Sequence, residues 1–475
     1  MRNRLKISFV FSALAGIFLL TNCHFLEVDP IGKTTIPLFF SNMDGIRAAL
    51  PGAYSAMYDY YDTEFSKYPE VAGDMARLNI VGEGTDMIDQ YNFTSNASQE
   101  TGAVGYIWRK IFVALANVNN ILEYQPALLE KYPEHANELR RIRGEALFLR
   151  ALCHFDLCRV YAQPFNYTSD GSHLGIPVLL KTPGANDNVA RKSTREVYDR
   201  IVRDLKDAEN EFAGIAERDV YHASLKSVQA FLARVYLYQE EWQLAADYAS
   251  QVIATTPLTP RERYLGMYNN MELGEECILR LNGTLKTSKL SKFYSFQVPV
   301  VYPADTLLSF FDDPQDIRLQ LLKPAADSSY QIRKYWVKKE VSEKEIHYDP
   351  FILRVSEQYL IRAEAYVNMN KLKEAAQDVS ALRTRATGKL TEDVRVASGD
   401  KESLAREVEI ERIKELCFEG HRFFDITRRK KDLIRDVKTN SSVRIKTYPN
   451  DWFVLPIPQK ELEANTNMQP NPGVN

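Results

Sequence analysis

Two segments of the chain repeat one another at a constant offset of 130 residues, and this repeat limits the possible folds more than any other feature. One segment, LARVYLYQEEWQLAADYASQVI, begins at Leu232, and the other, RAEAYVNMNKLKEAAQDVSALR, begins at Arg362. Matching positions carry similar side chains, as in the pairs Ala233 and Ala363, Tyr236 and Tyr366, Trp242 and Leu372, and Ala246 and Ala376. Apolar residues three and four apart on both sides of a short polar stretch predict two helices joined by a turn.

Small alanines where the two helices cross, with a bulky residue near the turn, are typical of tetratricopeptide repeats. One such helix pair cannot bury its apolar face alone, so several must stack. Helices expected around 107–123 and 140–162 are the other candidates. In the second range, apolar residues recur at steps of three and four, namely Ile142, Ala146, Leu149, Cys153, Leu157 and Val160. A helix this apolar is expected at the centre of the fold.

Two long stretches lack any helical period. Residues 62–105 are rich in loop-forming residues, and residues 255–350 carry short alternating or aromatic runs broken by Pro, Gly and Asn. These patterns predict irregular structure with a few short strands. Long loops on a rigid helical scaffold are where binding residues are expected.

The N-terminal residues have the features of an export signal. Arg2, Arg4 and Lys6 precede a mostly apolar run from 7 to 20, which is too short to span a bilayer comfortably. The run leads into Leu20, Thr21, Asn22 and Cys23, and this order resembles a bacterial lipobox. We therefore expect a signal peptide at 1–22 and lipidation of Cys23, which would hold the protein on a membrane surface by its lipid anchor only. The alternative is a plain signal with an incidental cysteine.

Charge and cysteine usage narrow the classes of partner. Loss of residues 1–22 removes three basic residues and no acidic one, so the formal net charge falls from −3 to −6. An acidic balance argues against a nucleic-acid partner, since affinity for phosphate backbones comes mainly from basic patches. Four cysteines follow Cys23, and none has zinc-ligand spacing with the histidines, so we expect buried free thiols at the positions Cys153, Cys158, Cys277 and Cys417.

Several motifs together resemble one family. They include FLEVDP after the cysteine, WRKIFVALANVNNIL, RGEALFLRALCHFDLCRVYA, EIERIKELCFEGHRFFDITR and the closing LPIPQKELEANTNMQPNPG. In this order they resemble the SusD/RagB-like outer-membrane nutrient-binding lipoproteins of Bacteroidetes. The resemblance implies a mostly α fold with a tetratricopeptide-like scaffold of about four helix pairs and an irregular, loop-rich half carrying a few short strands. It places one SusD-like domain at 23–475, with helical repeats near 40–61, 107–162, 194–254 and 352–430, and ligand-facing segments near 62–105 and 255–350.

The same resemblance implies a function. Members capture oligosaccharides at the cell exterior and deliver them to a SusC-like TonB-dependent transporter in the outer membrane, without catalysis and without a cofactor. Two alternatives stay open: capture of peptides by the same architecture, and a periplasmic tetratricopeptide scaffold that binds proteins only. Glu27 and Asp29 resemble the acidic export signal of surface lipoproteins, which favours the first function.

Candidate ligand-binding residues are chosen by loop placement and chemistry. Sugars need exposed aromatic faces together with amide, carboxylate or guanidinium groups that bond hydroxyls. The loops that offer both supply the candidate residues Asp74, Arg77, Asn79, Tyr91, Tyr294, Phe296 and Tyr302. Each aromatic side chain has the alternative role of core packing. We predict no catalytic residue and no metal site, because no acid cluster has the spacing of a calcium loop.

One charged motif, ERIKELCFEGHRFFDITRR at 411–429, has two interpretations. It could be an acid/base cluster that contains His421, or a network of paired charges that pins the last long helix, ended by Gly420. We favour the paired charges, which give the motif a structural role.

Overall fold

The computed structural model describes residues 35–80, 85–184, 187–269, 272–284, 286–294, 299–322, 331–335, 346–394, 396–397 and 399–474. The predicted signal peptide, Cys23 and Phe296 lie outside these ranges. The chain divides into two units, Met1–Arg47 and Ala48–Asn475. In the described part of the first unit, α2 (Ile36–Phe39) begins after Thr35, whose Oγ1 accepts a hydrogen bond from the amide of Leu38. The helix α3 (Met43–Tyr61) starts in the first unit and continues into the second.

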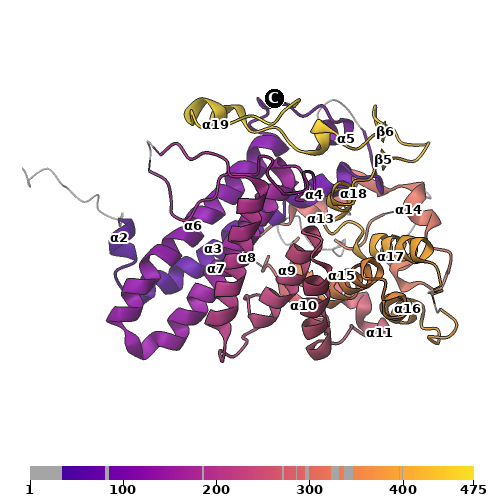
Figure 1. Cartoon of the computed structure of the whole chain (residues 1–475), viewed down its shortest axis with the longest axis horizontal. Helices are drawn as coiled ribbons and strands as arrows, with labels where there is room; N and C mark the ends of the chain where they lie inside the picture. The colour runs from indigo at the N-terminus through magenta and orange to yellow at the C-terminus, as the bar shows by residue number, and fades with distance from the viewer. Residues whose placement is uncertain are drawn as a thin grey trace, which may run out of the picture. The chain divides into compact units, whose positions relative to one another are not determined.

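The second unit is built mainly from helices. In chain order its longer helices are α4 (Glu64–Val71), α6 (Ala103–Lys131), α7 (Ala136–Tyr161), α8 (Thr194–Phe212), α9 (Leu225–Tyr238), α10 (Trp242–Thr255), α15 (Val355–Asn368), α16 (Leu372–Thr387) and α17 (Lys401–Leu416). Consecutive helices pack against one another as α6 on α7, α7 on α8, α9 on α10 and α15 on α16, and α10 packs on α15. Figure 1 shows these helices side by side. The mostly helical fold predicted from the sequence is confirmed.

The helix α7 lies at the centre of its neighbourhood, as its apolar sequence predicts. It packs between α6 and α8, and the residues of its predicted stripe, including Ile142 and Val160, are buried. At Gly144 an added Cβ would meet the ring of Phe212 on α8 at 3.0 Å. This contact shows how closely α7 and α8 approach each other. The four cysteines outside the signal region are all buried free thiols, as predicted.

The two sequence repeats have the same local structure. The second helices begin at Trp242 and at Leu372, which are matching positions. The residues two positions earlier, Glu240 and Asn370, both adopt left-handed backbone with φ of 62° and 60°. The amides of the residues that follow them donate to the carbonyls of Tyr236 and Tyr366 at 2.9 and 2.8 Å. Equal turn geometry at the 130-residue offset confirms that both segments form the same helix–turn–helix unit.

The irregular stretches carry part of the strands and short helices, and others lie in the C-terminal part of the chain after α17. Within the described ranges, three two-stranded antiparallel sheets form, pairing β1 (Ala76–Leu78) with β3 (Val301–Pro303), β2 (Cys277–Arg280) with β4 (Phe351–Arg354), and β5 (Leu433–Ile434) with β6 (Ile445–Lys446). The short helices are α5 (Ile88–Asn92), α11 (Arg261–Tyr264), α12 (Gly266–Asn269), α13 (Lys289–Tyr294), α14 (Asp305–Ser309), α18 (Arg422–Arg428) and α19 (Gln459–Ala464), with 3-10 turns at Pro133–His135, Ile317–Leu322 and Asp451–Phe453. Among the helices of the described ranges, none combines the length and the apolar character needed to cross a membrane.

Candidate ligand-binding surface

The pairing of β1 with β3 brings the two irregular stretches together. Arg77 lies directly opposite Tyr302 in this sheet, and the amide of Asn79 donates to the carbonyl of Val300 at 2.8 Å. Arg77, Asn79 and Tyr302 are all partly exposed. Three of the residues chosen for their chemistry therefore share one small surface, although they come from segments more than 200 residues apart.

A third segment, residues 435–440, completes this surface. The ammonium of Lys438 is paired with the carboxylate of Asp305 at 2.5 Å; the lysine side chain is largely exposed and the aspartate is partly exposed. The hydroxyl of Thr306 donates to Asp436 at 3.0 Å. The hollow between these segments measures only about 10 Å³, so the site is an open surface rather than a cavity. Residues 435–440 were not predicted, because nothing in their local sequence shows that they lie beside β1.

Asp74 lies at the edge of this surface but is occupied by an internal ion pair. Its two carboxylate oxygens accept from Nε and Nη2 of Arg422 at 2.6 and 2.8 Å, and the residue is 7% exposed. This two-point pairing ties the end of the early loop to α18. In this conformation the carboxylate of Asp74 has a structural role in the surface.

Tyr91 is buried beneath the same surface. Its hydroxyl lies 2.8 Å from Thr439 Oγ1 and donates to Asn440 Oδ1 at 2.8 Å, and its side chain has no exposed area. The guanidinium of Arg435 lies 4.5 Å from the centre of its ring. The ring offers no free face to a ligand in this structure, and Tyr91 supports the position of residues 439–440.

Arg435 joins the early loop to the C-terminal part of the chain. Its guanidinium donates to four backbone carbonyls, those of Val71 at 3.1 Å, Ala72 at 3.2 Å, Gly73 at 2.9 Å and Tyr91 at 2.6 Å. Burial away from water lowers the pKa of Arg435 to about 10. Sequence reasoning missed this residue, because these four carbonyls lie more than 340 positions away.

Tyr294 does not line the hollow of this surface. It sits at the end of α13, fully buried, with its ring stacked on that of Tyr335 at 4.6 Å between centres. Of the seven sequence-predicted ligand residues, the structure thus brings Asp74, Arg77, Asn79, Tyr91 and Tyr302 together, does not bring Tyr294 to them, and does not describe Phe296. Direct ligand contact by any of them stays a prediction.

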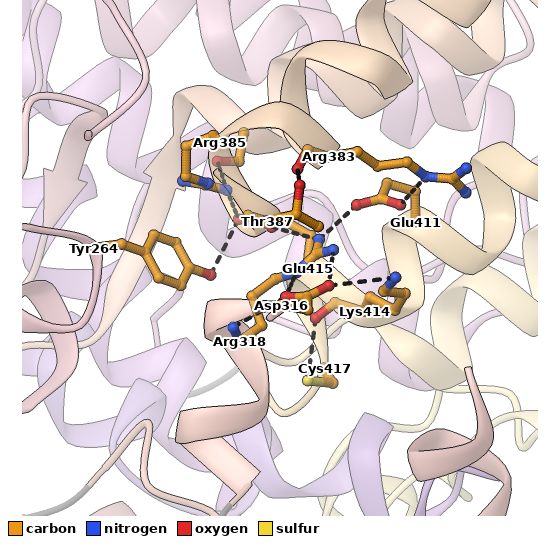
Figure 2. A network of polar contacts seen from close by, with 12 residues as sticks. Tyr264, Asp316, Arg318, Arg383, Arg385, Thr387, Glu411, Lys414, Glu415 and Cys417 are labelled. Atoms are coloured by element: carbon orange, nitrogen blue, oxygen red, sulfur yellow. Dashed lines mark hydrogen bonds and ion pairs between the residues drawn. The ribbon is translucent and has the colours of Figure 1, made fainter. Parts of the chain in front are cut away.

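A buried network of ion pairs surrounds the C-terminal end of α17, just before residues 416–435. Figure 2 shows Glu415 on α17 together with Arg318 and Arg385, which come from other elements, and with Lys414 of the same helix. The carboxylate accepts from Arg354 at 2.7 Å, from Arg385 at 2.7 Å and from Arg318 at 3.0 Å. Burial alone would raise the pKa of Glu415, but these guanidinium groups hold it well below its ordinary value. The carboxylate is therefore a structural anion at neutral pH.

One carboxylate from α4 accepts hydrogen bonds from several amides of the loop that follows α17. Glu70 accepts from the amides of Phe418, Gly420 and His421 at 2.9, 2.8 and 2.9 Å. The expectation that Gly420 ends the helix is wrong, because α17 ends at Leu416 and Gly420, with φ of 83°, lies in the loop before α18. The positive φ is tolerated because glycine has no Cβ.

The charges of the 411–429 motif are paired, as the favoured interpretation predicts. Asp425 accepts from Arg412 and Arg428 at 2.7 and 2.8 Å, and His421 is 8% exposed. Burial, together with nearby arginines, lowers the pKa of His421 well below its ordinary value. Across the described residues, no group of three His, Cys, Asp or Glu side chains is placed to hold a metal ion.

Comparison with known proteins identifies the family. Residues 320–473 match the profile of the SusD family, and residues 24–237 match a SusD-like profile described as starch-binding and associating with the outer membrane. The chain belongs to the SusD family. Proteins of this family bind carbohydrate and are not catalytic, in agreement with the expectation that the chain is not an enzyme.

Relatives match the chain over nearly its whole length. Two SusD-like proteins of Formosa agariphila are 24% and 22% identical, over 98% and 97% of this chain and 98% of each relative. Among solved structures, a protein of Bacteroides vulgatus described as a putative sugar-binding protein has a TM-score of 0.81 at 23% identity, covering 91% of this chain and 99% of that one. A laminarin-binding SusD-like protein has a TM-score of 0.71 at 19% identity, with 91% and 99% covered. These structures show that the fold is shared.

Proposed function

We propose that this protein captures oligosaccharides at the outer membrane and delivers them to a SusC-like TonB-dependent transporter. The observation that carries the proposal is membership of a family described as starch-binding and associated with the outer membrane. The surface formed by β1, β3 and residues 435–440 supports it, since it combines a guanidinium, an amide and a partly exposed phenol ring on loops held by a rigid scaffold.

The chemistry of this surface supports the proposal of sugar binding. The guanidinium of Arg77 and the amide of Asn79 can donate to sugar hydroxyls, and the ring of Tyr302 can contact the C–H face of a pyranose. The surface is open, and the donors of Arg77 and Asn79 are partly exposed, so water competes for their hydrogen bonds. We therefore expect weak to moderate affinity, of about millimolar to micromolar dissociation constant.

A single substitution tests this assignment. Replacing Arg77 by alanine removes a partly exposed cation, so we expect at least a fivefold loss of oligosaccharide affinity with an unchanged unfolding midpoint. The matched control is Arg218→Ala, which removes an exposed arginine from a loop before α9. Isothermal titration of each variant with the oligosaccharide that binds wild type gives the comparison. Equal affinity in wild type and Arg77→Ala would remove Arg77 from the site.

The anchoring and partner parts of the proposal rest on the N-terminal motif and on the family. We propose that Cys23 carries the lipid, that the protein faces the cell exterior, and that the signal peptide covers 1–22. Stable co-purification with a TonB-dependent barrel from detergent extracts of the native membrane is the expected result. Repeated isolation of the protein alone from gentle detergent would contradict the partnership, and resistance to protease added to whole cells would contradict the exterior location.

A further inference from the structure

A small cavity lies inside the second unit, where α17, α18 and the residue before β1 meet. Eight residues line it, and the seven that are buried are Met75, Arg412, Ile413, Leu416, Cys417, His421 and Asp425. The eighth, Arg422, is partly exposed. The cavity measures about 10 Å³, close to the roughly 10–15 Å³ that one buried water molecule requires. It therefore has room for one water molecule and for no larger ligand.

Three nitrogen atoms of the lining residues have no hydrogen-bond partner. They are Nη1 and Nη2 of Arg412 and Nδ1 of His421, which are shielded from solvent and bond to no described residue. Arg412 is 1% exposed and His421 is 8% exposed. Because a buried polar group without a hydrogen bond is costly, we expect the missing partner in the space that both residues line.

The nearby carboxylates do not supply this partner. One oxygen of Asp425 accepts from Nε of Arg412 at 2.7 Å, and the other accepts from Nε of Arg428 at 2.8 Å. Glu357 lies 3.9 Å from Nη2 of Arg412, which is too long for a hydrogen bond, and both of its oxygens accept from Arg234. Neither carboxylate therefore accepts a hydrogen bond from the Nη atoms of Arg412.

The three nitrogens require a ligand that both accepts and donates. An arginine stays protonated in proteins, so Nη1 and Nη2 of Arg412 can only donate. Burial, together with nearby arginines, lowers the pKa of His421, so its ring is neutral at pH 7 and one ring nitrogen can accept. A water molecule can accept from the guanidinium and donate to Nδ1 at the same time, whereas an anion can only accept.

The charge around the cavity also favours a neutral ligand. Among the described residues, Arg412 belongs to a connected network of five arginines and five carboxylates, namely Arg234, Arg412, Arg422, Arg428 and Arg429 with Asp74, Glu357, Glu364, Glu409 and Asp425. Lys431 also pairs with Glu409, but its side chain is 50% exposed. Because the arginines and carboxylates balance, an anion in the cavity would be a buried charge without compensation.

We propose that this cavity holds one structural water molecule, which accepts a hydrogen bond from the guanidinium of Arg412 and donates one to Nδ1 of His421. This water joins α17 to the residue that precedes α18, in the loop whose amides Glu70 accepts from. Met75, in the same lining, directly precedes the strand that carries Arg77. The site goes beyond the proposed function and does not depend on it.

The test is a set of crystal structures of the full mature chain, as wild type, His421→Phe and His421→Asn. Wild type is expected to show one peak of electron density within hydrogen-bond distance of an Nη atom of Arg412 and of Nδ1 of His421. His421→Phe keeps a ring but removes the acceptor, so the peak should disappear and the midpoint of unfolding in urea should fall. His421→Asn is the matched control, because its amide oxygen can replace Nδ1 as the acceptor, so the peak should remain.

Several outcomes would overturn the proposal. A wild-type cavity without a density peak, or a direct hydrogen bond from Arg412 to Glu357 or to His421, would remove the water. An unchanged peak in His421→Phe would show that the imidazole is not its partner. An anomalous bromine signal at this position, in wild-type crystals grown with sodium bromide, would assign the cavity to an anion instead. If His421→Phe does not fold, the wild-type density and the bromide crystals decide the question.

Discussion

Replacing Glu415 by glutamine tests whether the buried ion pairs hold the scaffold together. The side chain has no exposed area and accepts from three arginines at 2.7 to 3.0 Å. The network that contains it balances six cations, Arg318, Lys334, Arg354, Arg383, Arg385 and Lys414, against six acids, Glu276, Asp316, Glu407, Glu411, Glu415 and Glu419. Glutamine keeps the shape of the side chain but leaves one positive charge buried without compensation.

Breaking a buried pair in this way costs about 3–5 kcal/mol, a large share of the roughly 5–15 kcal/mol by which proteins are stable. We therefore expect the free energy of unfolding, measured by guanidinium titration and circular dichroism, to fall by about that amount. The matched control is Glu407→Gln at the edge of the network, where the carboxylate is 36% exposed and pairs with Arg383. An exposed pair contributes at most about 1 kcal/mol, so the control should lose less than that.

A second substitution separates charge from packing. Adding Arg385→Gln to the Glu415→Gln variant restores the balance of the network, so the double variant should lose less stability than the two single losses together. Equal unfolding free energies for Glu415→Gln and Glu407→Gln, or strict additivity in the double variant, would refute the reasoning.

Three further predictions follow from buried or strained positions. Tyr294→Ala removes a fully buried ring stacked on Tyr335, so the free energy of unfolding should fall by about 3–5 kcal/mol in a denaturant titration; an unchanged midpoint would contradict the packing. Burial raises the pKa of Asp316, but the charge of Arg318 outweighs burial and brings it to about 2, below the ordinary 3.8. An acid with a depressed pKa stabilises the fold above 3.8 and loses this effect as pH falls toward 2, so acid titration should show a loss of about 2 kcal/mol that is absent in Asp316→Asn. Asn370→Gly should unfold like wild type and Asn370→Val should lose about 1–2 kcal/mol, because φ is 60° there; equal midpoints would refute the turn geometry.

Local patterns predicted the scaffold well. The alanines and aromatic residues of the two repeats form contacts between helices that are adjacent in sequence. Their spacing therefore predicts the structure of each helix pair. The apolar stripe of α7 predicted the central position of this helix for the same reason. The end of α17 was misplaced because Glu70, on α4, supplies the partners of the loop amides, and no local signal marks that contact.

The candidate surface could be predicted only in part. Loop chemistry selected Arg77, Asn79 and Tyr302, and β-pairing across more than 200 residues brings them together. Burial of Tyr91 depends on Arg435, which lies 344 positions away, so its local sequence could not distinguish a packed ring from an exposed one. Lys438 belongs to the surface through the same long-range contacts and was missed.

The most direct measurement is isothermal titration of the full mature chain in detergent with starch, laminarin and plant oligosaccharides and with mixed peptides, followed by chromatography of each mixture. Saturable heat from one class of oligosaccharide, with every oligosaccharide recovered intact, is the predicted result. Binding of peptides alone, or release of shorter sugars during the titration, would contradict carbohydrate capture.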